Sequence, residues 1–125
     1  ERKKEQKARE AALQGLKNQA LLILDIAKEN TQAKGETEVG ELSMLAEIPT
    51  ITFETALVSE NLSEWIDSEK INAFLSRAYV INPLIAYYRA RKSQDYRRTG
   101  FTAEQIKQQN ELLIEDIEAL IQSFD

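Results

Sequence analysis

Apolar residues recur at helical spacing over the first third of the chain. From residue 13 the stripe advances by three or four residues at each step, through Leu13, Leu16, Ala20, Ile23 and Ala27. This spacing predicts an amphipathic helix from about residue 2 to residue 30. Further apolar residues widen the arc of this stripe, namely Leu21, Leu22, Leu24 and Ile26. We therefore expect a central helix that packs against two or more neighbours.

The pattern is broken between residues 30 and 67. Residues 30–40 are polar and contain two of the four glycines, which indicates a loop. Pro49 prevents a long helix, either Thr50 or Thr52 can cap a short helix through Leu57, and Asn61 with Glu64 resembles a capping box. We expect two or three short helices anchored by apolar residues, namely Val39, Leu42, Leu45, Ile48, Phe53, Leu57, Leu62 and Trp65.

A second long stripe begins after Asp67 and Ser68, either of which can cap a helix. It runs through Ile71, Phe74, Ala78, Ile81, Ile85 and Tyr88. This stripe predicts a helix over about residues 69–92. Pro83 falls inside it, so the helix either bends there or restarts with Asn82 as its cap.

The last helix is predicted over about residues 102–124. Thr102 with Gln105 resembles a capping box, and Gly100 can supply the turn before it. The apolar line that follows is Ile106, Leu113, Ile117, Leu120 and Phe124. Asn110 interrupts this line, and an asparagine in a helix seam more often fixes the register or faces a solvated edge than binds a ligand.

Together these elements predict an all-α fold. Three long helices form an antiparallel bundle, which a segment of short helices completes. The length of 125 residues fits a single domain over residues 1–125. Residues 1–12 carry no apolar stripe, so they either overhang the domain or continue a helix that begins before residue 1, and we favour the second interpretation.

The composition removes most of the common catalytic groups. The chain contains neither Cys nor His, so it cannot build thiolate nucleophiles, catalytic triads or His-based metal sites by itself. Glu111, Glu115 and Glu118 lie on a flank of the last apolar stripe, and without a His partner they are expected to form a solvated face. We predict neither enzymatic activity, nor a cofactor, nor a metal site.

Positive charge gathers in one stretch of this acidic chain, whose formal net charge is −5. Residues 87–98 read YYRARKSQDYRR, with five basic residues and one acidic residue. The candidate contacts for an anionic surface are Tyr87, Arg89, Arg91, Lys92, Tyr96, Arg97 and Arg98. Phosphates of lipid or nucleic acid would suit this set. The alternative is the solvated end of a helix, where cations are favoured by the helix dipole. Nucleic acid is disfavoured by the acidic pI of about 4.9.

Several segments resemble an uncharacterised group of helical domains that follow an N-terminal membrane helix in bacterial and archaeal proteins. The resemblance covers about residues 13–88. It is carried by Lys28-Glu29-Asn30, Ile51-Thr52-Phe53-Glu54-Thr55-Ala56-Leu57, Ser59-Glu60-Asn61-Leu62 and Ala78-Tyr79-Val80-Ile81-Asn82. The chain departs from the group at Phe53, where a Trp is expected, and at Glu60-Asn61, where a Gly turn is expected.

The resemblance implies a domain on the cytoplasmic face of a membrane. A membrane helix ending just before residue 1 would place five basic residues at its flank, Arg2, Lys3, Lys4, Lys7 and Arg9. In the membrane setting that the resemblance implies, residues 1–12 would be a juxtamembrane helical extension. Our leading hypothesis is a non-enzymatic interaction or scaffold domain of a membrane-anchored protein, with an unknown protein partner. The alternatives are a soluble cytoplasmic protein-binding adaptor, either monomeric or a homo-oligomer, and a nucleic-acid accessory domain.

Overall fold

The described residues of the chain form four α-helices in the computed structural model. The structure describes residues 2–32, 45–91 and 96–125, with the backbone alone for Arg91 and residues 96–101. The helices are α1 (Arg2–Gln32), α3 (Ile51–Leu57), α4 (Ser68–Arg91) and α5 (Tyr96–Ser123). The described part of the chain contains no strand, so the predicted all-α class is confirmed.

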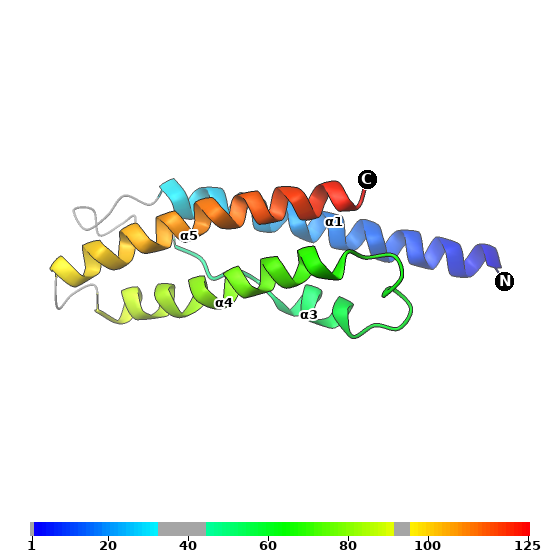
Figure 1. The fold of residues 1–125 in the computed structure, drawn as a ribbon, viewed down its shortest axis with the longest axis horizontal. Coiled ribbons are helices and arrows are strands. Elements are labelled where there is room, and N and C mark those ends of the chain that lie inside the picture. Colours follow the sequence, from blue (N-terminus) through cyan, green and yellow to red (C-terminus); the bar gives the residue numbers. More distant parts are fainter. Residues whose placement is uncertain (1, 33–44, 92–95) are drawn as a thin grey trace.

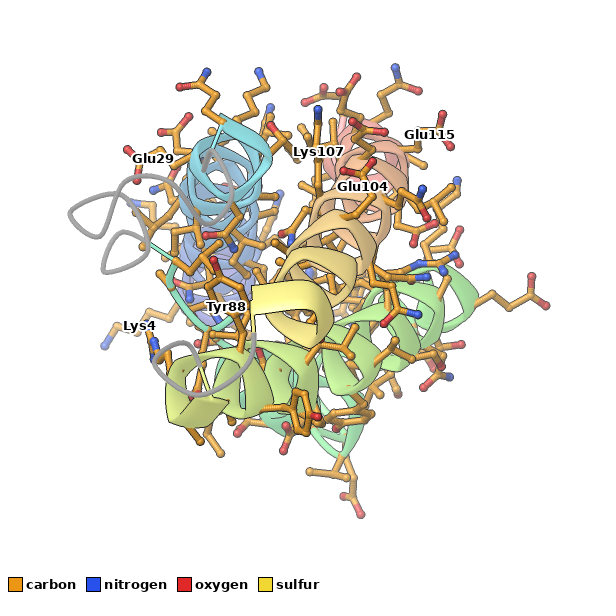
Figure 2. All side chains as sticks on the ribbon, turned by 90° about the vertical axis from the view of Figure 1, so that its left-hand side faces the viewer. Lys4, Glu29, Tyr88, Glu104, Lys107 and Glu115 are labelled. Carbon is orange, nitrogen blue, oxygen red and sulfur yellow. The ribbon has the colours of Figure 1, made fainter. Side chains whose placement is uncertain are left out.

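The three long helices form the predicted bundle. α1 and α4 run in the same direction, and α5 runs opposite to both and packs along each of them (Figures 1 and 2). The segment that ends in α3 lies between α1 and α4 and completes the bundle. α5 is therefore the central helix. The expectation that the first helix would be central was wrong, and Leu21 and Leu22 of α1 are 43% and 52% exposed.

The predicted apolar stripes form one common core. Each long helix buries the residues that recur at steps of three and four, and α3 adds Phe53, whose ring meets Phe74 edge-on at 5.3 Å between centroids. The largest buried apolar side chains are Ile23, Phe53, Ile71, Phe74, Ile81, Ile85, Tyr88, Ile106, Leu113, Ile117 and Leu120. Burial of these side chains is the main driving force for the fold, because each contributes about 1.5–3 kcal/mol.

α5 begins earlier than the sequence predicts. The helix starts at Tyr96, so Gly100 and Thr102 lie inside it, and Thr102 is not the cap. Thr102 is buried in line with Ile106 and Asn110, which means that the inward stripe extends one turn further back than the apolar residues alone indicate. Packing of this turn outweighs the cost of about 1 kcal/mol for a glycine inside a helix.

α4 continues through Pro83 without a restart. The inward stripe stays in phase on both sides of the proline, so a continuous helix keeps Ala78, Ile81 and Ile85 in the core together. The alternative in which Asn82 caps a new helix was wrong. The N-terminal cap is Asp67, whose carboxylate accepts a hydrogen bond from the Lys70 backbone N–H at 3.2 Å.

The segment before α3 is extended rather than helical. Residues 45–50 carry no regular secondary structure, and α3 is followed by turns up to residue 67. The described part of the predicted segment of short helices therefore contains one helix, seven residues long. Leu45 and Ile48 anchor the extended stretch in the core, as predicted, whereas the predicted anchors Val39 and Leu42 lie outside the described residues.

Candidate interaction surface

The predicted basic contact set lies at one end of the bundle. α4 ends and α5 begins at the end opposite to Arg2, the first residue of α1 (Figure 1). α1 is 31 residues long, which corresponds to about 46 Å of helix. Within a single chain, the basic start of α1 and the end of α4 therefore lie at opposite ends of the bundle.

The structure describes two side chains of that contact set, and they do different things. Tyr87 is 37% exposed on the outward face of α4. The Arg89 guanidinium donates a hydrogen bond to the carbonyl of Leu45, so this cation helps to hold the extended segment. Lys92 lies outside the described residues, and so do the side chains of Arg91, Tyr96, Arg97 and Arg98.

The buried asparagines hold backbone groups of the extended segment. Asn30 of α1 donates to the Ala46 carbonyl at 2.9 Å and accepts from the Ala46 N–H at 3.0 Å. Asn30 also donates to Oδ1 of Asn110, at 3.2 Å, and Asn110 donates to the Ile106 carbonyl at 2.8 Å. Because these polar groups are satisfied inside the core, Asn110 acts as a structural seam residue, as predicted.

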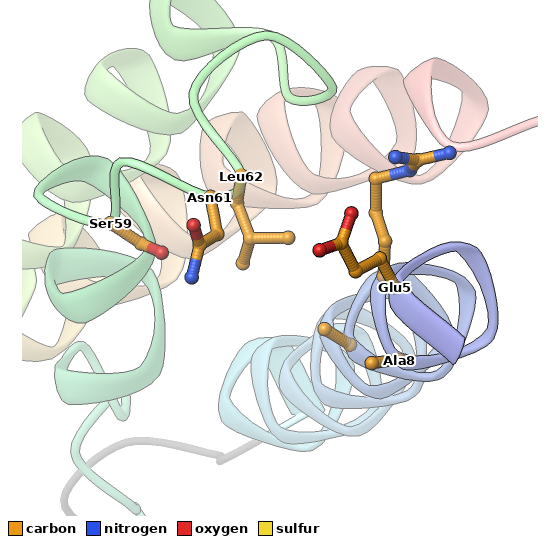
Figure 3. Close-up of a pocket in the computed structure, with 7 residues that line it drawn as sticks. Glu5, Ala8, Ser59, Asn61 and Leu62 are labelled. Atoms are coloured by element: carbon orange, nitrogen blue, oxygen red, sulfur yellow. The ribbon is translucent and has the colours of Figure 1, made fainter. Parts of the chain in front are cut away.

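A shallow cleft lies between the start of α1 and the turns after α3 (Figure 3). Its volume is about 500 Å³, and its lining combines small and polar residues: Glu5, Ala8, Arg9, Ala12, Ser59, Asn61 and Leu62. Beside it the Arg9 guanidinium stacks on the Trp65 ring, 3.8 Å from its centroid. Trp65 is 49% exposed, so its prediction as a core anchor was wrong. Of its polar lining residues, Glu5 and Asn61 are exposed, whereas Arg9 and Ser59 are half-buried, so this lining contains no fully buried polar side chain.

The outward face of α4 carries a second stripe parallel to the one in the core. This outward stripe also advances by steps of three and four and consists of Ala73, Ser76, Val80, Pro83, Tyr87 and Ala90. All six residues are exposed, with Val80 at 48%, and the neighbouring Tyr79 is 53% exposed. A helix with apolar or small residues on two opposite faces is typical of one that packs on both sides.

This face of α4 is also free of charge. Between Lys70 and Arg89 the sequence contains a single charged residue, Arg77. Arg77 turns towards α5, where it bonds Asp116 at 3.3 Å and Gln109 at 3.0 Å. We refer to the outward stripe together with Tyr79 as the neutral face of α4.

The outward side of α5 provides a contrast. It carries Glu104, Lys107, Glu111, Glu115 and Glu118, all of them exposed (Figure 2). These carboxylates form the solvated face that the sequence predicts. Among the residues that the structure describes, no group of three or more acidic side chains is placed to hold a metal ion.

Exposed apolar residues continue from the neutral face onto α3. Ile51 and Val58 are 70% and 81% exposed and share one face of α3 with Glu54. Desolvation and a hydrogen bond to the Glu54 carboxylate raise the pKa of the Tyr79 phenol. The exposed apolar residues therefore continue from α4 onto α3, where the Glu54 carboxylate lies beside them.

The sequence contained the signal for the neutral face, although the prediction did not use it. The gap in charge between Lys70 and Arg89 is visible in a chain in which 30% of the residues are charged. Pattern analysis assigned residues 71–88 to the core by their inward stripe, and the second stripe on the same helix was missed.

Comparison with known proteins provides no relative. No protein-family model, curated protein or solved structure matches the chain. Within the described ranges, no helix combines the length and apolar character needed to cross a membrane. The arguments for function therefore come from the surface itself.

Proposed function

We propose that this chain is a non-enzymatic helical scaffold domain that self-associates, with the neutral face of α4 as its contact surface. The observation that carries the proposal is the uncharged outward stripe between Ala73 and Ala90, on a helix whose opposite side already forms the core. Burial of such a stripe is favourable, since it removes apolar surface from water without desolvating a charge.

A second copy of the same chain suits this face because of charge. The chain carries a formal net charge of −5, so most surfaces of two copies repel each other. The neutral face is where two copies can approach without that penalty. Its small residues, such as Ala73 and Ser76, also allow two helix backbones to come close together.

The pairing would be isologous, with the same face used by both copies. Homo-oligomers most often have this two-fold symmetry, and the face is self-complementary because it has no charge of either sign. Ile51 at the start of α3 and Val58 just after its end are exposed beside this face, but Glu54 shares their side, so the uncharged contact is limited to α4.

Membrane anchoring and the cytoplasmic location stay predictions from the resemblance. The basic start of α1 supports contact with an anionic surface, since Arg2, Lys3, Lys4 and Lys7 are all exposed. The proposed self-association does not depend on such an anchor.

The experiment is sedimentation equilibrium over a concentration series with the native chain, Val80→Glu and Leu22→Glu. Val80 and Leu22 are matched, at 48% and 52% exposure on outward helix faces, and both substitutions add one negative charge. We expect the native chain and Leu22→Glu to approach twice the monomer mass of 14.3 kDa, and Val80→Glu to remain monomeric.

Two results would overturn the proposal. One is a native chain that stays monomeric at every concentration, which would leave the neutral face to a different protein. The other is a dimer that Val80→Glu and Leu22→Glu weaken equally, which would place the contact elsewhere. Far-ultraviolet circular dichroism of each variant checks that its helices are retained.

A further inference from the structure

The neutral face also indicates how two copies are oriented. We infer that the two α4 helices pair antiparallel, with the two-fold axis between Val80 and Pro83, an inference that rests on the proposed self-association. This orientation follows from the order of side-chain sizes along the stripe and from the charges at the two ends of α4.

Side-chain size favours the antiparallel pair. With the axis between Val80 and Pro83, Ser76 of each copy lies opposite Tyr87 of the other, and Ala73 lies opposite Ala90. A small residue then faces the bulkiest one, which lets the two helices keep an even separation. In a parallel pair each residue would meet its own copy, so two Tyr87 rings would collide while the layers at Ala73 and Ser76 stayed open.

Charge at the helix ends favours the same orientation. At its start α4 has Asp67 and Glu69 against Lys70, a net charge of −1, and it ends with Arg89 and Arg91. Antiparallel packing brings the acidic start of one helix beside the basic end of the other, and it also opposes the two helix dipoles. Parallel packing would place like charges together at both ends.

The antiparallel pair has a consequence for the basic segments. In one chain the start of α1 and the end of α4 lie at opposite ends of the bundle (Figure 1). When the second copy is reversed, the start of its α1 comes to the same end as the end of α4 in the first copy. Each end of the dimer then combines the basic α1 start of one copy with the end of α4 of the other copy, where Arg89 lies.

Disulfide cross-linking tests the orientation. The chain contains no cysteine, so Ala73→Cys and Ala90→Cys can be introduced singly without background. Both positions are exposed. In an antiparallel dimer of one Ala73→Cys copy and one Ala90→Cys copy, the two introduced thiols lie opposite each other. In a dimer of two identical variants, the two thiols are about 25 Å apart along the helix axis. A disulfide requires Cα atoms within about 7 Å.

One variant carries an affinity tag, so that the mixed disulfide and the two homodisulfides differ in mass. The two variants are mixed and then oxidised mildly. We expect the mixed disulfide between the two variants to dominate strongly over both homodisulfides. Leu22→Cys, on the outward face of α1, measures the yield from random collision.

The outcomes separate the orientation from the self-association. Homodisulfides of Ala73→Cys that exceed the collision level, in a chain of dimer mass, would overturn the antiparallel orientation and leave the proposed function standing. A monomeric native chain in which all products match the collision level would overturn both. If the mixed disulfide dominates, and if adding Val80→Glu to the two cysteine variants abolishes it, both the antiparallel orientation and the self-association are supported.

Discussion

The side chain of Asn82 pairs with both backbone polar groups of Ile48. Its Oδ1 accepts from the Ile48 N–H at 2.6 Å, and its Nδ2 donates to the Ile48 carbonyl at 2.9 Å. Asn30 holds Ala46 in the same way from α1. Two carboxamides therefore replace the strand neighbour that an extended segment normally needs.

Replacement of Asn82 by Ala should destabilise the fold by about 1–3 kcal/mol, because it leaves the N–H and the carbonyl of Ile48 without partners in a partly buried place. Asn72→Ala is the matched control, since Asn72 lies exposed on the same helix. Urea unfolding measures both. Equal midpoints for the two variants would contradict a role for Asn82 in holding the segment.

Gly15→Ala should stabilise the chain by about 0.5–1 kcal/mol. Gly15 lies inside α1, and a Cβ added there meets no atom within 4 Å. The gain comes from the lower backbone entropy of Ala in the unfolded chain and its higher helix propensity. The reverse change at an exposed site of the same helix, Ala11→Gly, should destabilise by a similar amount. A destabilising Gly15→Ala would show that this turn of α1 contacts something, such as a partner, that the single chain does not include.

Arg9→Gln should expose Trp65 further and cost about 0.5–1 kcal/mol, the usual value for a cation–π pair near the surface. The chain has a single tryptophan, so fluorescence quenching by acrylamide reports on this ring alone. We expect more efficient quenching in Arg9→Gln than in the native chain. Lys7→Gln, which removes a neighbouring exposed cation, should leave the quenching unchanged, and an equal effect of both variants would argue against the stacked geometry.

The helices and their inward stripes could be predicted because the period of three to four residues is a local property. The start of α5 could not be predicted in this way, because packing of the buried turn around Thr102 outweighs the local signals at Gly100 and Thr102. Trp65 was placed in the core on its size, while its actual neighbour, Arg9, is distant in sequence. The hydrogen bonds between asparagine side chains and the backbone could not be predicted for the same reason, since Asn82 and Ile48 come together only in the folded chain.

For the candidate surface, the sequence indicated where charge lies along the chain better than where that charge lies in the folded bundle. The stretch 87–98 stands out because it is basic, but its place at the end of the bundle opposite to the start of α1 follows from the direction of α4, which no local pattern specifies. The neutral face of α4 requires knowledge of which side of the helix the core occupies.

The stability that Asp67 contributes should depend on pH. The backbone N–H of Lys70 and, to a smaller extent, the Lys70 ammonium, 3.5 Å away, lower the pKa of Asp67 below its usual 3.8, against a smaller opposing effect of burial. Since the folded-state pKa is lowered, the stabilisation is fully present above the unfolded value and is lost as the pH falls through the folded value. We expect the native chain to unfold at higher urea concentration than Asp67→Asn at neutral pH, with the difference closing in strong acid. A difference that is constant over this range would show that the charge of Asp67 contributes nothing.

Binding to anionic vesicles should depend on the proposed dimer, because the antiparallel pair would bring the basic start of α1 of one copy to the end of α4 of the other. Co-sedimentation with vesicles of phosphatidylserine and phosphatidylcholine compares the native chain with Val80→Glu and Leu22→Glu. We expect Leu22→Glu to bind as the native chain does and Val80→Glu to bind more weakly, since the monomer presents one basic segment at a time. Added salt should weaken the binding of all three proteins, because the contact is electrostatic.

Equal binding of the two glutamate variants would mean that a single basic segment is sufficient. Replacement of Arg2, Lys3, Lys4 and Lys7 by Gln would then identify which segment it is.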